Sequence, residues 1–242
     1  MKIVIRLFGV FLLILSICFF ISCSKKSQNH FYAQLYYNDP TKNGVRGIKG
    51  TFLIPSTTYN TSTTDYLTFE QWIGANGATD SDSPSNGQWF ELGFMTGATD
   101  NSRQGFYSHY KGMFKGKQIN GQYWEVTIPN ATWAPYTTNI FRIADTGTTT
   151  SHNWAIFIDN TSYGAFADNV GPAGHLIASQ GYEKWYNNVN ILPLSTGYIR
   201  ERYFYSGGSN GTWSSITGAS TYNELGIVSS IQSQNGGYDF IP

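Results

Sequence analysis

The residue types that most often carry out chemistry are sparse in this chain of 242 residues. The four histidines lie far apart in sequence, and none is spaced from another as metal ligands are: His30, His109, His152 and His175. The sequence also contains none of the GxSxG, HExxH, P-loop or protein-kinase motifs. It therefore predicts no metal site and no bound cofactor.

Thiol chemistry is confined to the start of the chain, where Cys18 and Cys23 are the two cysteines. Two basic residues precede an apolar run that extends over residues 7–21, and the small residue Ser22 follows it. This order is typical of a secretory signal peptide. The run of about 15 residues is shorter than the roughly 20 that a membrane-spanning helix needs. We therefore predict a signal peptide over residues 1–22 rather than a permanent membrane span.

The segment Phe20-Ile21-Ser22-Cys23 resembles the lipobox of bacterial lipoproteins. The resemblance implies that the chain is cut before Cys23, whose thiol carries a diacylglyceryl group of the palmitate type. Residues 23–29 then form a lipidated tether, and the several acyl chains give stable anchoring to a membrane. Ser24 stands where an inner-membrane retention signal has Asp. We expect an exported protein anchored at the outer membrane or the cell surface.

The remaining chain of about 220 residues is long enough for one domain with a sizeable core, which we place over residues 30–242. Without Lys2 and Arg6, 13 basic residues stand against 15 acidic residues, a formal net charge of −2. This balance argues against nucleic acid as a partner, because nucleic acid requires a basic face. The sequence gives no indication of oligomeric state. With no cysteine after Cys23 there is no disulfide, so packing must stabilise the domain.

Strand patterns dominate the domain, and helical periodicity is almost absent. The chain is rich in aromatic residues, with 7 Trp, 17 Tyr and 16 Phe. The expected strands cover residues 31–37, 47–54, 68–74, 88–94, 105–111, 123–128, 137–145, 153–159, 191–194, 199–205 and 227–232. Residues 159–164 are expected to form a turn, and residues 175–187 are ambiguous between a strand and a helical turn. The pattern predicts an all-β fold, a two-sheet antiparallel β-sandwich of jelly-roll type.

Two of these segments show a clear alternation of apolar and polar residues. In residues 153–159, Trp154, Ile156 and Ile158 share one face. In residues 123–128, Trp124, Val126 and Ile128 share one face, whereas Tyr123, Glu125 and Thr127 point away. Each segment is therefore expected to bury one face against a core.

The order of motifs in the first half of the domain suggests a family. Trp72-Ile73-Gly74-Ala75-Asn76-Gly77 is followed by Trp89-Phe90-Glu91-Leu92-Gly93, then by the aromatic segment 105–110 and the strand that ends at Asp159. This order resembles the glutamic peptidases, or eqolisins, over about 100 residues. These peptidases have a W-[VI]-G-x-[DN]-G turn and then a strand with Gln-x-Gly. The resemblance implies a β-sandwich related to the concanavalin A-like lectins.

In that family a Gln and a later Glu activate water against a peptide bond. The resemblance places Glu91 at the position of the Gln and makes Glu183 the best match for the Glu. The change from Gln to Glu matters, because a carboxyl group can donate a hydrogen bond to a developing oxyanion only when it is protonated. The alternative is that both are solvated surface charges. The E-x-[DE]-x-E pattern of concanavalin A-like glycosidases is absent.

Aromatic side chains suggest binding rather than catalysis, because an aromatic plane can stack on a sugar ring. The side chains considered for this role are Trp72, Trp89, Tyr107, Tyr110 and Trp133. Trp133 lies between two prolines and is expected in a loop.

Three functions remain open from the sequence. The first is a surface-anchored, non-catalytic domain that binds a polysaccharide or a polypeptide. The second is an acid peptidase that uses Glu91 and Glu183. The third is a structural lipoprotein of the cell envelope. The spatial relation of Glu91 and Glu183 separates the second from the others.

Overall fold

The computed structural model describes residues 30–58, 65–75, 87–101, 106–185, 192–207, 211–224 and 227–242. The predicted signal peptide, Cys23 and the tether at residues 23–29 lie outside these ranges. No helix in the described ranges has the length and apolar character to cross a membrane.

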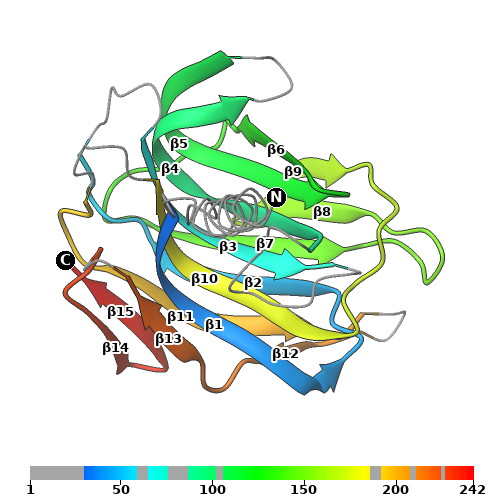
Figure 1. The fold of residues 1–242 in the computed structure, drawn as a ribbon. Coiled ribbons are helices and arrows are strands. Elements are labelled where there is room, and N and C mark those ends of the chain that lie inside the picture. The colour runs from blue at the N-terminus through cyan, green and yellow to red at the C-terminus, as the bar shows by residue number, and fades with distance from the viewer. Residues whose placement is uncertain are drawn as a thin grey trace, which may run out of the picture.

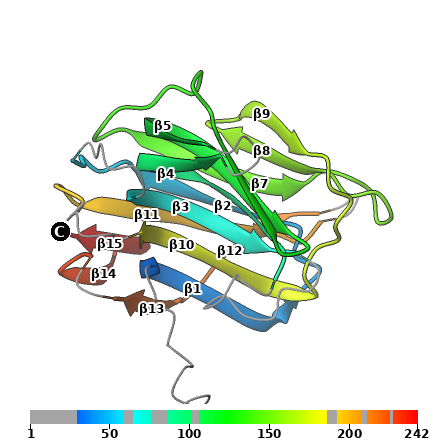
Figure 2. The ribbon, with the colours of Figure 1, turned by 45° about the horizontal axis from the view of Figure 1, so that its top comes forward.

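The described chain forms two antiparallel sheets that pack face to face as a β-sandwich (Figure 1). Sheet A has the strand order β13-β1-β10-β3-β4-β5-β6. Its strands are β1 (His30–Asn43), β3 (Tyr66–Gly74), β4 (Trp89–Asn101), β5 (Phe106–Ile119), β6 (Gln122–Thr127), β10 (His175–Trp185) and β13 (Ser220–Asn223). Figure 2 shows β1, β10, β3 and β4 side by side in this layer, although β10 is distant from them in sequence.

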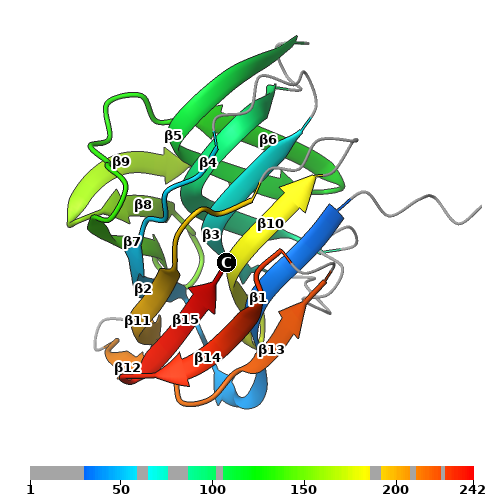
Figure 3. The same cartoon turned by 90° about the vertical axis from the view of Figure 1, so that its left-hand side faces the viewer.

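Sheet B has the order β14-β15-β11-β2-β7-β8-β9, with β12 paired to β11. Its strands are β2 (Gly47–Leu53), β7 (Thr138–Asp145), β8 (Trp154–Ile158), β9 (Thr161–Phe166), β11 (Gly197–Tyr205), β12 (Trp213–Ser215), β14 (Ser230–Gln234) and β15 (Gly237–Ile241). In Figure 3 the strands β2, β7, β8, β9 and β11 of this layer lie to the left of β3, β4 and β10 of sheet A.

Aromatic rings fill the space between the sheets. The Phe69 ring lies 4.5 Å from that of Tyr182, 5.3 Å from that of Phe52 and 5.6 Å from that of Phe240, measured between centroids. These side chains are almost fully buried. Because side chains alternate along a strand, the residues between these positions point to the outer faces of the sheets.

Most expected strands are present, and β7 and β8 match their predicted ranges within one residue. Trp154, Ile156 and Ile158 do face the core together. The ambiguous segment that begins at His175 is the strand β10, which pairs along its length with β1 and β3.

Other expectations were wrong. The described residues 192–194 form no strand but a single bridge between Pro193 and Thr57, because proline has no N–H for a longer ladder. The expected turn at residues 159–164 is confined to Asp159 and Asn160, whose φ angles are 50° and 68°, and β9 begins at Thr161. The strand expected at residues 227–232 begins only at Ser230.

Candidate functional site

The outer face of sheet A carries four glutamates from four strands. Glu70 lies on β3, Glu91 on β4, Glu125 on β6 and Glu183 on β10. The inward-facing neighbours Phe69, Phe90 and Tyr182 belong to the core, so strand alternation places the glutamates on the opposite face. We call these four residues the carboxyl cluster.

Strand register arranges the cluster along a diagonal. Glu183 is opposite Thr68, whereas Glu91 is opposite Trp72, four residues further along β3. Glu70 lies midway between these two rows. With strands about 4.8 Å apart and about 3.3 Å per residue, the Cα atoms of Glu91 and Glu183 are roughly 16 Å apart, and each is roughly 8 Å from that of Glu70. Glu91 and Glu183, the pair expected from the sequence, therefore lie on strands that flank β3, with Glu70 between them.

Hydrogen bonds divide the cluster into two pairs. The Tyr123 hydroxyl lies 2.7 Å from Glu91 Oε1 and 2.8 Å from Glu125 Oε2, so it bridges these two carboxyl groups. The Tyr66 hydroxyl donates to Glu183 Oε1 at 2.9 Å. Glu183 also shares a hydrogen bond with Glu70. Tyrosine hydroxyl groups thus bind the carboxyl groups at both ends of the diagonal, Glu91 and Glu183.

Burial and mutual repulsion favour the protonated carboxyl groups. Loss of hydration raises the pKa of Glu70 well above its usual range, and Glu183 and Glu91 raise it further. The hydrogen bond with Glu183 acts in the same direction. Burial also raises the pKa of Glu91, as do Glu125 and Glu183, against the opposing hydrogen bond from Tyr123. Both residues are therefore neutral acids in mildly acidic solution.

The carboxyl group of Glu70 has an oxygen that accepts no hydrogen bond from the described residues. Glu70 is only 1% exposed, and its Oε1 has no hydrogen-bond partner among the described residues. A buried polar atom without a partner is costly and commonly marks a functional position. A substrate or a water molecule is a natural partner for this oxygen.

Two glycines make room for the carboxyl groups. A Cβ atom on Gly93 would lie 2.4 Å from Glu70 Cβ. A Cβ atom on Gly116, which separates Glu91 from Glu125 across the sheet, would lie 2.1 Å from Glu91 Oε1. Larger residues at these positions would displace the cluster.

The two tryptophans expected to bind a ligand lie beside the cluster, where they pack against protein. Trp72 and Trp89 are 4% and 8% exposed and form a small apolar cluster with Ala173 and Ile177. Tyr123 packs against the same cluster, and its ring centroid is 5.5 Å from that of Trp89. Stacking of a sugar on either indole would require the segment at Ala173 to move.

The other predicted binding residues lie elsewhere. Trp133 is in the expected loop between β6 and β7, but it is half-buried and its ring centroid is 4.7 Å from that of Phe94. Tyr110 is half-buried on β5. Tyr107 is paired with Asp100 on the neighbouring strand, and its side chain lies outside the described part of the chain.

Sequence reasoning did not select Glu70 as a functional residue. Glu125 was expected only to point away from Trp124, which it does. The available signal for Glu70 was its spacing from Trp72, because residues two apart share one face of a strand. The contact with Glu183 depends on β10 pairing with β3, which no local pattern indicates.

Among the described residues, no group of three or more His, Cys, Asp or Glu side chains is arranged to hold a metal ion.

Solved structures of other proteins have a similar architecture. The fold is similar to that of scytalido-glutamic peptidase with a transition state analog inhibitor, with a TM-score of 0.50 and 11% identity, over 89% of this chain and 98% of that one. The chain has the fold of a glutamic peptidase. SCP-B, an eqolisin peptidase in complex with the tripeptide Ala-Ile-His, also matches, with 11% identity, the same coverage and a TM-score of 0.41. No family model and no curated protein sequence matches.

The glutamic-peptidase fold agrees with the resemblance found in the sequence, and at this level of identity it describes architecture alone. The chemistry of the site must be argued from its own residues. Those residues are four glutamates and three tyrosines on one sheet face, with Tyr32 opposite Glu183 as the third tyrosine.

Proposed function

We propose that this protein is an acid-active peptidase that uses the carboxyl cluster on the outer face of sheet A. The proposal rests on the contact between the Glu70 and Glu183 carboxyl groups and on the raised pKa values of Glu70 and of Glu91 on the neighbouring strand. Two carboxyl groups that share one proton can supply a base and an acid at the same pH.

The proposed reaction begins with water activated by ionised Glu183, which accepts one proton as the water oxygen attacks the peptide carbonyl carbon. Neutral Glu91 donates a hydrogen bond to the developing oxyanion, the role for which the glutamic peptidases use an amide. Glu70 then gives its proton to the leaving nitrogen as the C–N bond breaks. Proton transfer from Glu183 to Glu70 through their hydrogen bond restores the starting state.

Glu91 gives a sharp test, because glutamine keeps a neutral hydrogen-bond donor at every pH. In hydrolysis of an unfolded protein between pH 3 and 7, Glu91→Gln should keep activity and extend it to higher pH. Glu91→Ala should lower kcat/KM by about 100-fold. Glu183→Gln and Glu70→Gln should each lower it by at least about 100-fold, because each removes a proton-transfer group.

The exposed Glu201 on sheet B provides the matched control, and Glu201→Gln should leave the rate unchanged. Loss of activity in Glu91→Gln would show that Glu91 must ionise, which the proposed role forbids. Absence of hydrolysis by the folded wild-type protein over the whole pH range would reject the peptidase function.

We also propose, from the sequence alone, that the enzyme is exported and tethered to a membrane through a lipid on Cys23. Metabolic labelling with an alkyne fatty acid should mark the wild-type protein and leave Cys23→Ser unmarked. Equal labelling of both proteins would place the lipid elsewhere.

A further inference from the structure

The outer face of sheet B, on the far side of the sandwich from the carboxyl cluster, carries two cations directly opposite each other. Lys49 on β2 is the register partner of Arg142 on β7. Their neighbours Ile48 and Ile143 are core residues, so both cations point outward. Like charges at directly opposed positions of a sheet are destabilising. A bound anion would relieve this repulsion.

Nearby acidic groups compensate this pair only in part. Burial lowers the pKa of Lys49, and the positive charge of Arg142 lowers it further, while Glu201 opposes them. Glu201 is exposed and accepts a hydrogen bond from Thr51 at 2.8 Å. Arg142 Nε is buried and has no hydrogen-bond partner among the described residues. The Arg142 side chain as a whole is half-buried, so an anion would meet the guanidinium over its exposed part.

Aromatic rings flank the cations along the same row. Phe157 on β8 is opposite Arg142, and Tyr203 on β11 is opposite Lys49. The Arg142 guanidinium carbon is 3.7 Å from the centroid of the Phe157 ring. Lys49 Nζ is 4.6 Å from the centroid of Tyr203 and 4.8 Å from that of Trp213. Across the four strands, an aromatic residue therefore lies on each side of the two adjacent cations.

Two cavities adjoin this row. One of about 700 Å³ is lined by Arg142, Phe157, Tyr205 and Trp213, and its wall is the hydroxyl-bearing segment 146–149. The other, of about 720 Å³, is lined by Tyr198, Tyr203 and Ser215, among other residues. Lys49 contacts an aromatic ring of each cavity, so a chain molecule could occupy both and pass over the cations.

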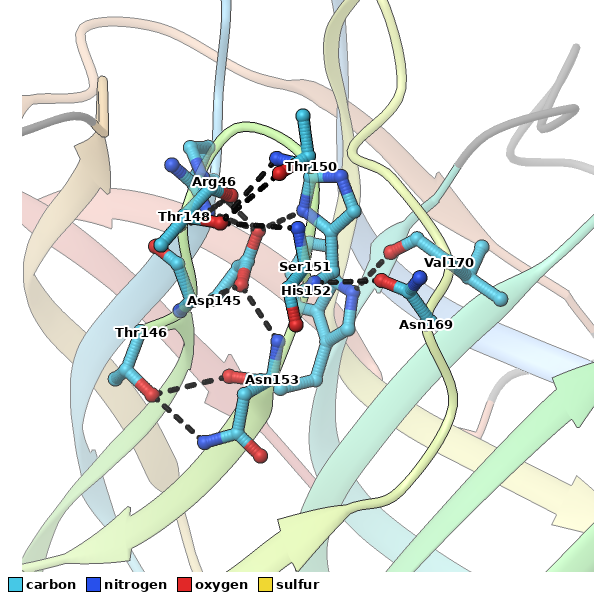
Figure 4. Close-up of polar contacts among 12 residues, drawn as sticks. Arg46, Asp145, Thr146, Thr148, Thr150, Ser151, His152, Asn153, Asn169 and Val170 are labelled. Atoms are coloured by element: carbon cyan, nitrogen blue, oxygen red, sulfur yellow. Dashed lines mark hydrogen bonds and ion pairs between the residues drawn. The ribbon is translucent and has the colours of Figure 1, made fainter.

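The wall of the first cavity is held in place by a buried carboxylate (Figure 4). Asp145 Oδ1 accepts hydrogen bonds from the backbone N–H groups of Gly147 and Asn153 at 3.0 and 2.9 Å. Its Oδ2 is bound by Arg46 Nη2 at 2.5 Å and lies 2.6 Å from His152 Nδ1. The Arg46 guanidinium also donates to the carbonyl oxygens of Gly147 and Thr148. The site is therefore pre-organised.

We infer that this face binds an acidic polysaccharide, with sugar carboxylates on Lys49 and Arg142 and sugar rings against the flanking aromatic residues. Carboxylates suit a guanidinium and an ammonium group, and the planar rings suit the C–H faces of sugars. A nucleic acid fits less well, because the chain as a whole has a formal net charge of zero and nucleic acid requires a broad basic face.

The test compares hexagalacturonate with its methyl-esterified form, in which neutral esters replace the carboxylates, by isothermal titration calorimetry. The acidic probe should bind, and the neutral ester should bind at least about tenfold more weakly. Lys49→Gln and Arg142→Gln should each weaken binding of the acidic probe by at least about tenfold, with circular dichroism as the check on folding. Lys42→Gln, which removes a cation from sheet A, should leave the affinity unchanged.

Three results would overturn the inference: equal affinity for the ester, no binding of the acidic probe by the folded protein, or tighter binding of a thymidine dodecanucleotide. Lys49→Gln serves if Arg142→Gln fails to fold, because Lys49 is only half-buried. Glu70→Gln should bind hexagalacturonate normally, so this experiment stands apart from that on the carboxyl cluster.

Discussion

Glu70 on β3 and Glu183 on β10 share a hydrogen bond, although 113 positions separate them in the sequence. Two ionised carboxylates at this separation would repel each other in a poorly hydrated setting, so the contact requires a proton. This single bond links the fold to both the stability and the proposed activity of the protein.

The pH dependence of stability should show the protonated carboxyl groups directly. The pKa values of Glu70 and Glu91 are raised above the ordinary value of about 4.5, so the folded state binds more protons than the unfolded state above that pH. Their contribution is complete below about pH 4.5 and is lost as the pH rises through the folded-state pKa values. Each pKa unit corresponds to about 1.4 kcal/mol. Urea unfolding should therefore give a free energy that falls from pH 5 to pH 8.

Glu70→Gln should reduce this fall, because glutamine does not titrate, and Glu70→Gln with Glu91→Gln should reduce it further. Glu201→Gln should keep the wild-type slope. A slope that is identical in the wild type and the double variant would mean that both glutamates are ionised in the folded protein.

Gly116→Ala should displace the Glu91 carboxyl group without removing it. The new methyl group would fall 2.1 Å from Glu91 Oε1, so the side chain must move away from Tyr123. We expect a folded protein whose peptidase kcat/KM falls by at least about tenfold, since small misplacements of positioned groups are costly. Gly121→Ala is the comparison for kinetics, because no atom lies within 4 Å of a Cβ there, although its φ of 73° adds strain. Unchanged kinetics in Gly116→Ala would remove Glu91 from the site.

Asp145→Asn should destabilise the wall of the cavity on sheet B. Burial alone raises the pKa of Asp145, but the hydrogen bonds from Asn153, His152, Gly147 and Arg46 outweigh it and leave the pKa below its ordinary value. The stabilisation by Asp145 is therefore present above about pH 4 and is lost on further acidification.

At pH 7 the Asp145→Asn variant leaves the buried Arg46 without its ionic partner, a loss of about 3 kcal/mol or more in the free energy of unfolding. The difference from wild type should shrink below pH 4. An equal difference at pH 7 and pH 3 would show that the carboxylate charge plays no part.

Phe69→Ala should be among the most damaging core substitutions. Its ring contacts those of Tyr182, Phe52 and Phe240, which belong to three further strands of the two sheets. The resulting cavity should cost about 3–5 kcal/mol, measured by urea unfolding at pH 5. Leu53→Ala, at a half-buried position of β2, should cost about 1 kcal/mol or less. Similar losses in both variants would argue against a core centred on Phe69.

The sequence by itself determined the fold class and the faces of single strands. Alternation in β8 correctly placed Trp154 toward the core, and alternation in β6 placed Tyr123 and Glu125 away from it, because side-chain direction in a strand depends only on neighbouring positions. The W-I-G and E-L-G segments likewise indicated the glutamic-peptidase architecture that the structure has.

Only the tertiary structure decided which glutamates meet. Glu91 and Glu183 were selected from the sequence, yet β3 lies between their strands and places Glu70 between them. The same holds for Lys49 and Arg142, which are unremarkable in sequence and become opposed when β2 pairs with β7. Strand order and register arise from long-range packing of the whole core, so the grouping of charges across strands is a property of the folded sheets.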